Sequence, residues 1–114
     1  MALDQWSQFL KDTRLSWSGV YSKSVRFGSG LVLSVQASRT HMCDPKEDNP
    51  ATGWHSFEVY AWCPVTLHDQ ALMGVQSPED TELEQPLSCV SIEQLDAVAK
   101  NNGGIAGCHW DGTE

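Results

Sequence analysis

The sequence predicts an α+β fold in a single domain over residues 1–114, with a mainly antiparallel sheet of three to four strands flanked by two helices. Three observations support this prediction. Apolar residues recur at helical spacing near both ends of the chain, apolar and polar residues alternate through its middle, and 114 residues is the usual size of one domain. We therefore expect the order helix, hairpin, strand, strand, helix.

The first segment is predicted to form an amphipathic helix of about three turns. Its apolar residues fall on one helical face, namely Leu3, Trp6, Phe9 and Leu10. A hairpin follows, because apolar residues occupy alternate positions on both sides of the turn-forming run 27–30. Its two strands are expected to share one apolar face, formed by Trp17, Tyr21, Val25 and Phe27 in the first and by Leu31, Leu33, Val35 and Ala37 in the second.

Residues 39–53 carry prolines, a glycine and many charges, which predicts a loop of unusual length for a compact domain. Residues 54–63 follow as the clearest strand of the chain, rich in aromatic and β-branched residues. We expect this strand to lie centrally, since both of its faces are apolar. Glu58 is the only charge in its interior, and it is expected to lie at a sheet edge or to pair with Arg26 or Arg39.

The second half of the chain is less regular. Residues 67–75 are consistent with a short helix, and the run 77–80 with the start of another, because Ser and Pro are followed by two acids. Residues 87–90 predict a brief strand. Ser91 and Gln94 have the spacing of a capping box, which predicts a helix that ends at residues 101–103. Residues 105–114 are expected to form an irregular tail.

The five tryptophans are assigned by their neighbours. Trp6, Trp17 and Trp62 are expected in the core, whereas Trp54 and Trp110 border loops and are expected to anchor a protein interface. Tryptophans also stack on the bases of single-stranded nucleic acids, but such binding needs a basic groove. The charge around these residues is negative, so we expect no direct binding to nucleic acid.

Charge is distributed unevenly along the chain. Residues 1–40 contain five basic and two acidic residues, a net charge of +3, whereas residues 41–114 contain two basic and thirteen acidic residues, a net charge of −11. Such a surface attracts cationic partners and repels nucleic acid and anionic membranes. The first residues lack the apolar core of a signal peptide, and no apolar run has membrane-spanning length. We expect a cytoplasmic protein without membrane contact, whose four cysteines are reduced.

One combination of residues suggests an enzyme. Two pairs of residues supply the ligand types of a zinc site, or a cysteine nucleophile with a histidine to activate it. These are His41 with Cys43, and Cys108 with His109. Neither pair has the spacing of ordinary zinc ligands, and the acids around Cys43 oppose a thiolate. We expect no catalytic residues, no metal and no other cofactor, and we keep a small metal- or thiol-dependent enzyme as an alternative.

Four stretches of the sequence carry a resemblance to a protein family: the runs Ser34–Ser38 and His41–Pro45, the strand core Phe57–Val59 and the run Asn102–Ile105. Together they resemble a family of small phage- and prophage-encoded proteins with no assigned activity, although Met42 replaces a usual aromatic residue and Lys46 a usual arginine. The resemblance implies a phage origin and, in infection, a bacterial cytoplasm. Small acidic phage proteins without enzymatic motifs are often inhibitors of host defence, including anti-CRISPR proteins.

Most of the candidate partner-binding residues lie in two acidic loops. We expect them to present carboxylates to Lys and Arg on a host protein or ribonucleoprotein, such as a CRISPR effector, in place of nucleic acid. The expected function is inhibition of a host defence complex, and the alternative explanations are a solvated surface or a self-associating structural or regulatory phage protein. The partner-binding residues are predicted to be Asp44, Glu47, Asp48, Trp54, Glu79, Asp80, Glu82, Glu84 and Trp110.

Overall fold

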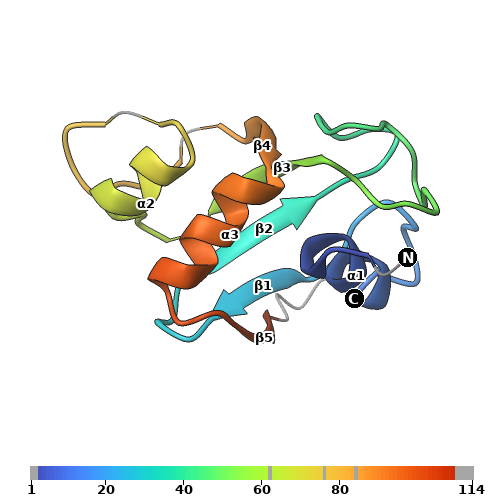
Figure 1. Cartoon of the computed structure of the whole chain (residues 1–114), viewed down its shortest axis with the longest axis horizontal. Helices are drawn as coiled ribbons and strands as arrows, with labels where there is room; N and C mark the ends of the chain where they lie inside the picture. The colour runs from blue at the N-terminus through green and yellow to red at the C-terminus, as the bar shows by residue number, and fades with distance from the viewer. Residues whose placement is uncertain (1–2, 62, 76, 84, 110–114) are drawn as a thin grey trace.

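A five-stranded sheet with the order β4-β3-β2-β1-β5 forms the centre of the molecule (Figure 1). The computed structural model of the chain describes residues 3–61, 63–75, 77–83 and 85–109. All four pairs of neighbouring strands are antiparallel, which confirms the predicted α+β fold with one strand more than expected. The strands are β1 Ser24–Phe27, β2 Val32–Gln36, β3 Ser56–Ala61, β4 Leu87–Ser91 and β5 Ile105–His109.

Three helices accompany the sheet: α1 Gln5–Asp12, α2 Leu67–Leu72 and α3 Ile92–Asn101. The Asp4 carboxylate caps α1 by accepting hydrogen bonds from the first-turn N–H groups. The predicted capping box begins α3, with Ser91 and Gln94 each bonded to the other's backbone N–H. The predicted helices at both ends of the sequence are therefore confirmed, with α2 as a third.

The core lies between one face of the sheet and the helices. Alternate residues of β2 and β3 point into it, and Trp6 of α1 and Leu95 of α3 are buried in the same cluster. The alternate residues of opposite orientation, Ser34, Gln36, Glu58 and Tyr60, lie on the second face of the sheet. Figure 1 shows α3 in front of β2, over the first face. The second face is therefore the polar one.

Two tryptophan assignments are corrected by the structure. Trp17 is 60% exposed, because residues 16–20 form a turn and β1 begins only at Ser24. Trp54 is 1% exposed and so cannot be the surface anchor that its position beside a loop suggested. It contacts Phe57 in the core, and its indole N–H donates to the Glu47 carbonyl at 2.9 Å. Trp6 is buried as predicted, whereas Trp62 and Trp110 lie outside the described residues.

Two backbone predictions are also wrong. Residues 77–80 do not start a helix, because Thr81 pairs with Val65 as a β-bridge and Ser77 makes local hydrogen bonds to the backbone of Glu79. Residues 105–109 are not an irregular tail but form β5, which pairs with β1 at the edge of the sheet. Residues 110–114 lie outside the described residues.

None of the helices in the described part of the chain combines the length and the apolar character needed to cross a bilayer.

Candidate functional site

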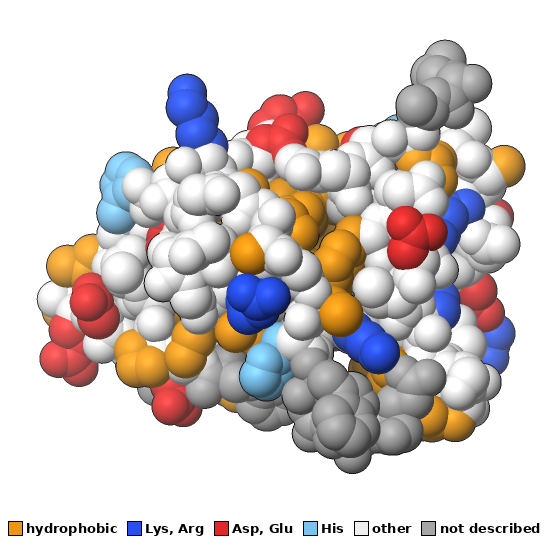
Figure 2. Space-filling model, turned by 90° about the horizontal axis from the view of Figure 1, so that it is seen from below, with side chains coloured by type: hydrophobic (Ala, Val, Ile, Leu, Met, Phe, Trp, Pro, Cys, Tyr) orange, Lys and Arg blue, Asp and Glu red, His pale blue; other side chains and the backbone are white. Residues whose placement is uncertain are grey.

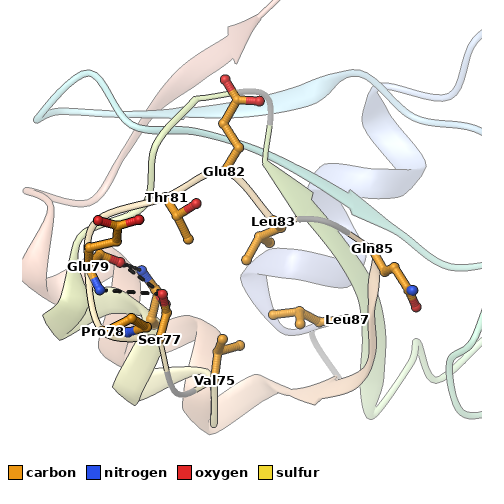
Figure 3. A pocket seen from close by; sticks show the side chains of 10 residues that line it. Val75, Ser77, Pro78, Glu79, Thr81, Glu82, Leu83, Gln85 and Leu87 are labelled. Atoms are coloured by element: carbon orange, nitrogen blue, oxygen red, sulfur yellow. Dashed lines mark hydrogen bonds between the residues drawn. The ribbon is translucent and has the colours of Figure 1, made fainter.

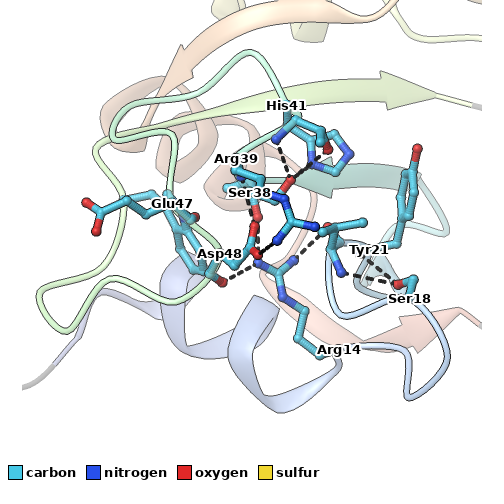
Figure 4. Close-up of polar contacts among 12 residues, drawn as sticks. Arg14, Ser18, Tyr21, Ser38, Arg39, His41, Glu47 and Asp48 are labelled. Atoms are coloured by element: carbon cyan, nitrogen blue, oxygen red, sulfur yellow. Dashed lines mark hydrogen bonds and ion pairs between the residues drawn. The ribbon is translucent and has the colours of Figure 1, made fainter.

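The first acidic loop is partly neutralised by the molecule itself, through one of its three carboxylates. The Asp48 carboxylate forms an ion pair with Arg39, and the Asp48 carbonyl accepts a hydrogen bond from Arg14 at 2.8 Å (Figure 4). Asp44 and Glu47 are exposed, but Lys46 is exposed between them. Asp48 therefore holds the loop in place, and the loop offers a partner less negative charge than the sequence suggested.

Arg14 ties this loop to the hairpin. Its guanidinium donates to four acceptors at 2.6 to 3.1 Å and lies 5.3 Å from the centre of the Trp54 ring; the acceptors are the carbonyls of Val20, Ala37 and Asp48 and the hydroxyl of Ser22. Burial lowers the pKa of Arg14, an effect that the nearby Asp48 opposes. One of the five basic residues in residues 1–40 is thus used to hold the fold together.

The second acidic loop is different. Glu79, Asp80 and Glu82 are exposed, and no ion pair within the described residues involves them. The sequence contains no Lys or Arg between Lys46 and Lys100. Glu84 belongs to the same predicted set and lies outside the described residues. Figure 2 shows carboxylates at the left-hand end of the molecule, where α2 lies in Figure 1, and also at the top and right of this face, with basic side chains at the upper left, in the centre and at the right.

The three described acids of this loop are not equivalent. The Asp80 carboxylate accepts a hydrogen bond from the Leu67 N–H at 3.0 Å, at the first residue of α2. The carboxylates of Glu79 and Glu82 make no hydrogen bond within the described residues. Asp80 therefore has a structural role as well, whereas Glu79 and Glu82 are available to a partner.

A hollow of about 440 Å³ lies beside these acids. Val75, Leu83 and Leu87 project toward it, and Glu82 points away from its rim (Figure 3). Gln70 also lines it and is 1% exposed. The Gln70 amide N–H groups donate to two backbone carbonyls, whereas its Oε1 has no partner within the described residues. The site thus combines an apolar floor, an unused acceptor and a negative rim.

The residues of the alternative enzyme site are not brought together. The loop of His41 and Cys43 lies beside β4, where the Met42 carbonyl accepts a hydrogen bond from the Cys89 N–H at 3.0 Å. Cys108 and His109 are in β5, at the opposite edge of the sheet. Among the described residues, no group of three or more His, Cys, Asp or Glu side chains is placed to hold a metal ion.

His41 has surroundings that the sequence did not indicate. Its imidazole is 3% exposed, Nδ1 lies 2.6 Å from the Ser38 hydroxyl, and the Tyr21 ring stands edge-on at 4.9 Å between centroids. Nε2 has no partner within the described residues. Burial lowers the pKa of His41, with Glu58 opposing the shift, and burial raises the pKa of the Cys43 thiol.

Glu58 is also placed differently than expected. It lies in β3, which is not an edge strand, and forms no ion pair with Arg26 or Arg39 within the described residues. Its Oε1 accepts the Met42 N–H at 3.2 Å. Alternation along β3 is the sequence signal that places Glu58 on the polar face, but no local pattern brings Tyr21 and His41 to the same place.

Comparison of the chain with protein-family models, with curated proteins and with solved structures finds no match.

Proposed function

We propose that this protein is a non-enzymatic binding protein that inhibits a nucleic-acid-binding complex, of the kind used in bacterial host defence. In this proposal the protein contacts the complex through the acidic loop 77–83. The observation that carries it is the availability of the Glu79 and Glu82 carboxylates, which are exposed and unpaired within the described residues, in a stretch without Lys or Arg.

A surface that binds nucleic acid presents Lys and Arg at positions set by the spacing of phosphates. Carboxylates form charge-assisted hydrogen bonds with the same side chains, so an acidic loop competes with phosphate for them. The net charge of −8 adds long-range attraction toward a basic surface. Inhibition follows if the bound protein keeps DNA or RNA away from that surface.

The arrangement of the other acids supports this choice of loop. Asp48 is bound by Arg39 and Arg14, so a partner cation would have to displace an existing contact. Glu79 and Glu82 need no such exchange. The enzyme alternative receives less support, because the loop of His41 and Cys43 contacts β4, whereas Cys108 and His109 lie in β5, which pairs with β1.

The proposal is tested by competition. Gel filtration first gives the oligomeric state of the protein, and a tagged copy is then incubated at low salt with a nuclease-treated lysate of a bacterial host. The captured complex is titrated with duplex DNA and with guide-like RNA. The proposal predicts that one of these nucleic acids displaces the protein, and a stable ternary complex at saturating nucleic acid would contradict it.

A further inference from the structure

The polar face of the sheet contains a second, shallow hollow of about 410 Å³, distinct from the one beside the acidic loop. β2 and β3 form its floor, and two loop residues and Pro86 form its walls. It is lined by Tyr21, Ser34, Gln36, His41, Glu58 and Tyr60 together with Pro86. Three aromatic rings thus surround one carboxylate.

The charge of this hollow is negative. Glu58 is half-buried in it, and one of its oxygens is occupied by the Met42 N–H. The other carboxylate oxygen has no hydrogen-bond partner within the described residues. His41 is neutral near pH 7, because burial opposes its protonation. A cation that enters the hollow therefore meets a carboxylate and the electron-rich faces of tyrosine rings, and both attract it.

His41 adds an unused polar atom. Ser38 accepts the Thr40 N–H, and its hydroxyl lies 3.0 Å from the Thr40 hydroxyl. If the Ser38 hydroxyl donates its hydrogen to the Thr40 hydroxyl, its oxygen accepts the Nδ1–H of His41. In this tautomer the Nε2 of His41 carries no hydrogen and is an acceptor. Nε2 is buried and has no partner within the described residues, an arrangement that is uncommon for a polar atom. The Tyr21 ring beside the imidazole is 46% exposed, and access of a ligand to Nε2 requires that this ring shift.

We infer that this hollow receives an arginine side chain of a partner protein. A guanidinium is planar, always charged and carries five N–H donors, so it can stack on a tyrosine ring while it donates to Glu58 and to His41 Nε2. A lysine ammonium matches this arrangement less well, because it has no flat face to stack.

The inference deepens the proposed function and rests on it for the identity of the partner as a basic protein. Pro86 lines this hollow, and its neighbours Gln85 and Leu87 line the hollow beside the acidic loop, so the two hollows adjoin the same segment of the chain. The binding of arginine itself is tested without the partner. The binding of arginine and the proposed function can therefore be disproved independently of each other.

The test uses N-acetyl-arginine amide as the probe, at low salt and pH 7. Its binding is followed by amide NMR shifts of the isotope-labelled protein, with the N–H of Met42 as the reporter beside Glu58. The lysine and citrulline analogues are titrated in parallel, since citrulline keeps the planar shape but has no charge. We expect saturable binding of the arginine probe, weaker binding of the lysine probe and no saturable binding of the citrulline probe.

Three variants complete the design. Glu58→Gln keeps the acceptor for Met42 but removes the charge, and should weaken the arginine probe by about tenfold or more. Tyr21→Ala should weaken it by roughly two- to fivefold, whereas Tyr21→Phe keeps the ring and should bind as wild type does. Glu93→Gln, an exposed acid on α3, is the control and should have no effect. Equal affinities for wild type and Glu58→Gln, or equal binding of arginine and citrulline probes, would overturn the inference.

Discussion

The Ser38 hydroxyl and His41 Nδ1 lie 2.6 Å apart, and both side chains are buried. This hydrogen bond fixes the imidazole in the loop that follows β2 and directs Nε2 away from Ser38. The Cys43 thiol of the same loop donates to the Ser38 carbonyl at 3.3 Å. His41 and Cys43, which the sequence suggested as parts of an enzyme, thus form a compact turn with Ser38 beside Glu58.

The first prediction concerns pH. The folded-state pKa of His41 is lowered below its ordinary value of 6.5, so the unfolded chain binds the proton more readily. Stability should therefore fall as pH decreases below about 6.5, until the folded-state pKa is passed. His41→Gln should remove this part of the pH dependence. Urea unfolding between pH 7.5 and 5 checks it, and an identical slope in wild type and variant would contradict the assignment.

The second prediction concerns the cysteines. Cys43 is buried and its thiol pKa is raised, whereas Cys89 and Cys108 are exposed. Because the thiolate is the reactive form, iodoacetamide at pH 8 should label Cys89 and Cys108 well before Cys43. Mass spectrometry of peptides gives the three rates. In urea the difference should disappear, and rapid labelling of Cys43 in the folded protein would show that this loop is open.

The third prediction concerns Arg14. Arg14→Lys should lower the free energy of unfolding by roughly 1–3 kcal/mol, because one ammonium nitrogen cannot replace two guanidinium nitrogens. One of these nitrogens donates to Val20 and Ser22, and the other to Ala37 and Asp48. Arg39→Lys is the matched control. The Arg39 side chain is 68% exposed, so its ion pair with Asp48 should contribute less than about 1 kcal/mol. Equal losses in the two variants would show that Arg14 does not hold the loop.

The fourth prediction concerns the core. Leu95 is fully buried in α3, so Leu95→Ala should cost roughly 2–5 kcal/mol through lost burial and the cavity left behind. Leu67→Ala is the control, since Leu67 is 46% exposed at the start of α2 and should cost less than about 0.5 kcal/mol. Thermal unfolding of wild type and of the two variants measures both losses of stability. A Leu95→Ala protein as stable as wild type would refute the assigned core face.

The sequence predicted the elements whose own residues carry the signal. α1 and α3 have caps and apolar stripes, β2 has alternating apolar and polar residues, and β3 is rich in aromatic and β-branched residues. The structure corrects the expectation that both faces of the third strand are apolar, because Glu58 and Tyr60 lie on the polar face. β5 was missed because Ile105–His109 contains one large apolar residue and a glycine, and its place is decided by pairing with β1. Trp17 was misplaced because the alternation of the first strand was extended through a turn.

The candidate site was predictable only in part. The acidic loop 77–83 follows from composition, but its contrast with the first loop depends on contacts between residues distant in sequence, such as Arg14 with Asp48. The hollow around Glu58 also depends on residues that are distant in sequence, because Tyr21, His41 and Glu58 come from three segments. No local pattern encodes such meetings, so the sequence alone could not indicate them.

The central claim, that Glu79 and Glu82 bind a basic partner, is tested most directly by two variants of equal net charge. Changing Glu79 and Glu82 to Lys alters the charge by four, from −8 to −4, and changing Asp44 and Glu47 to Lys does the same in the first loop. The measurement is the affinity of each protein for the captured complex over a series of salt concentrations. We expect the Glu79 and Glu82 variant to bind at least about tenfold more weakly than the Asp44 and Glu47 variant, with a flatter salt dependence. Equal affinities for the two variants at every salt concentration would contradict it.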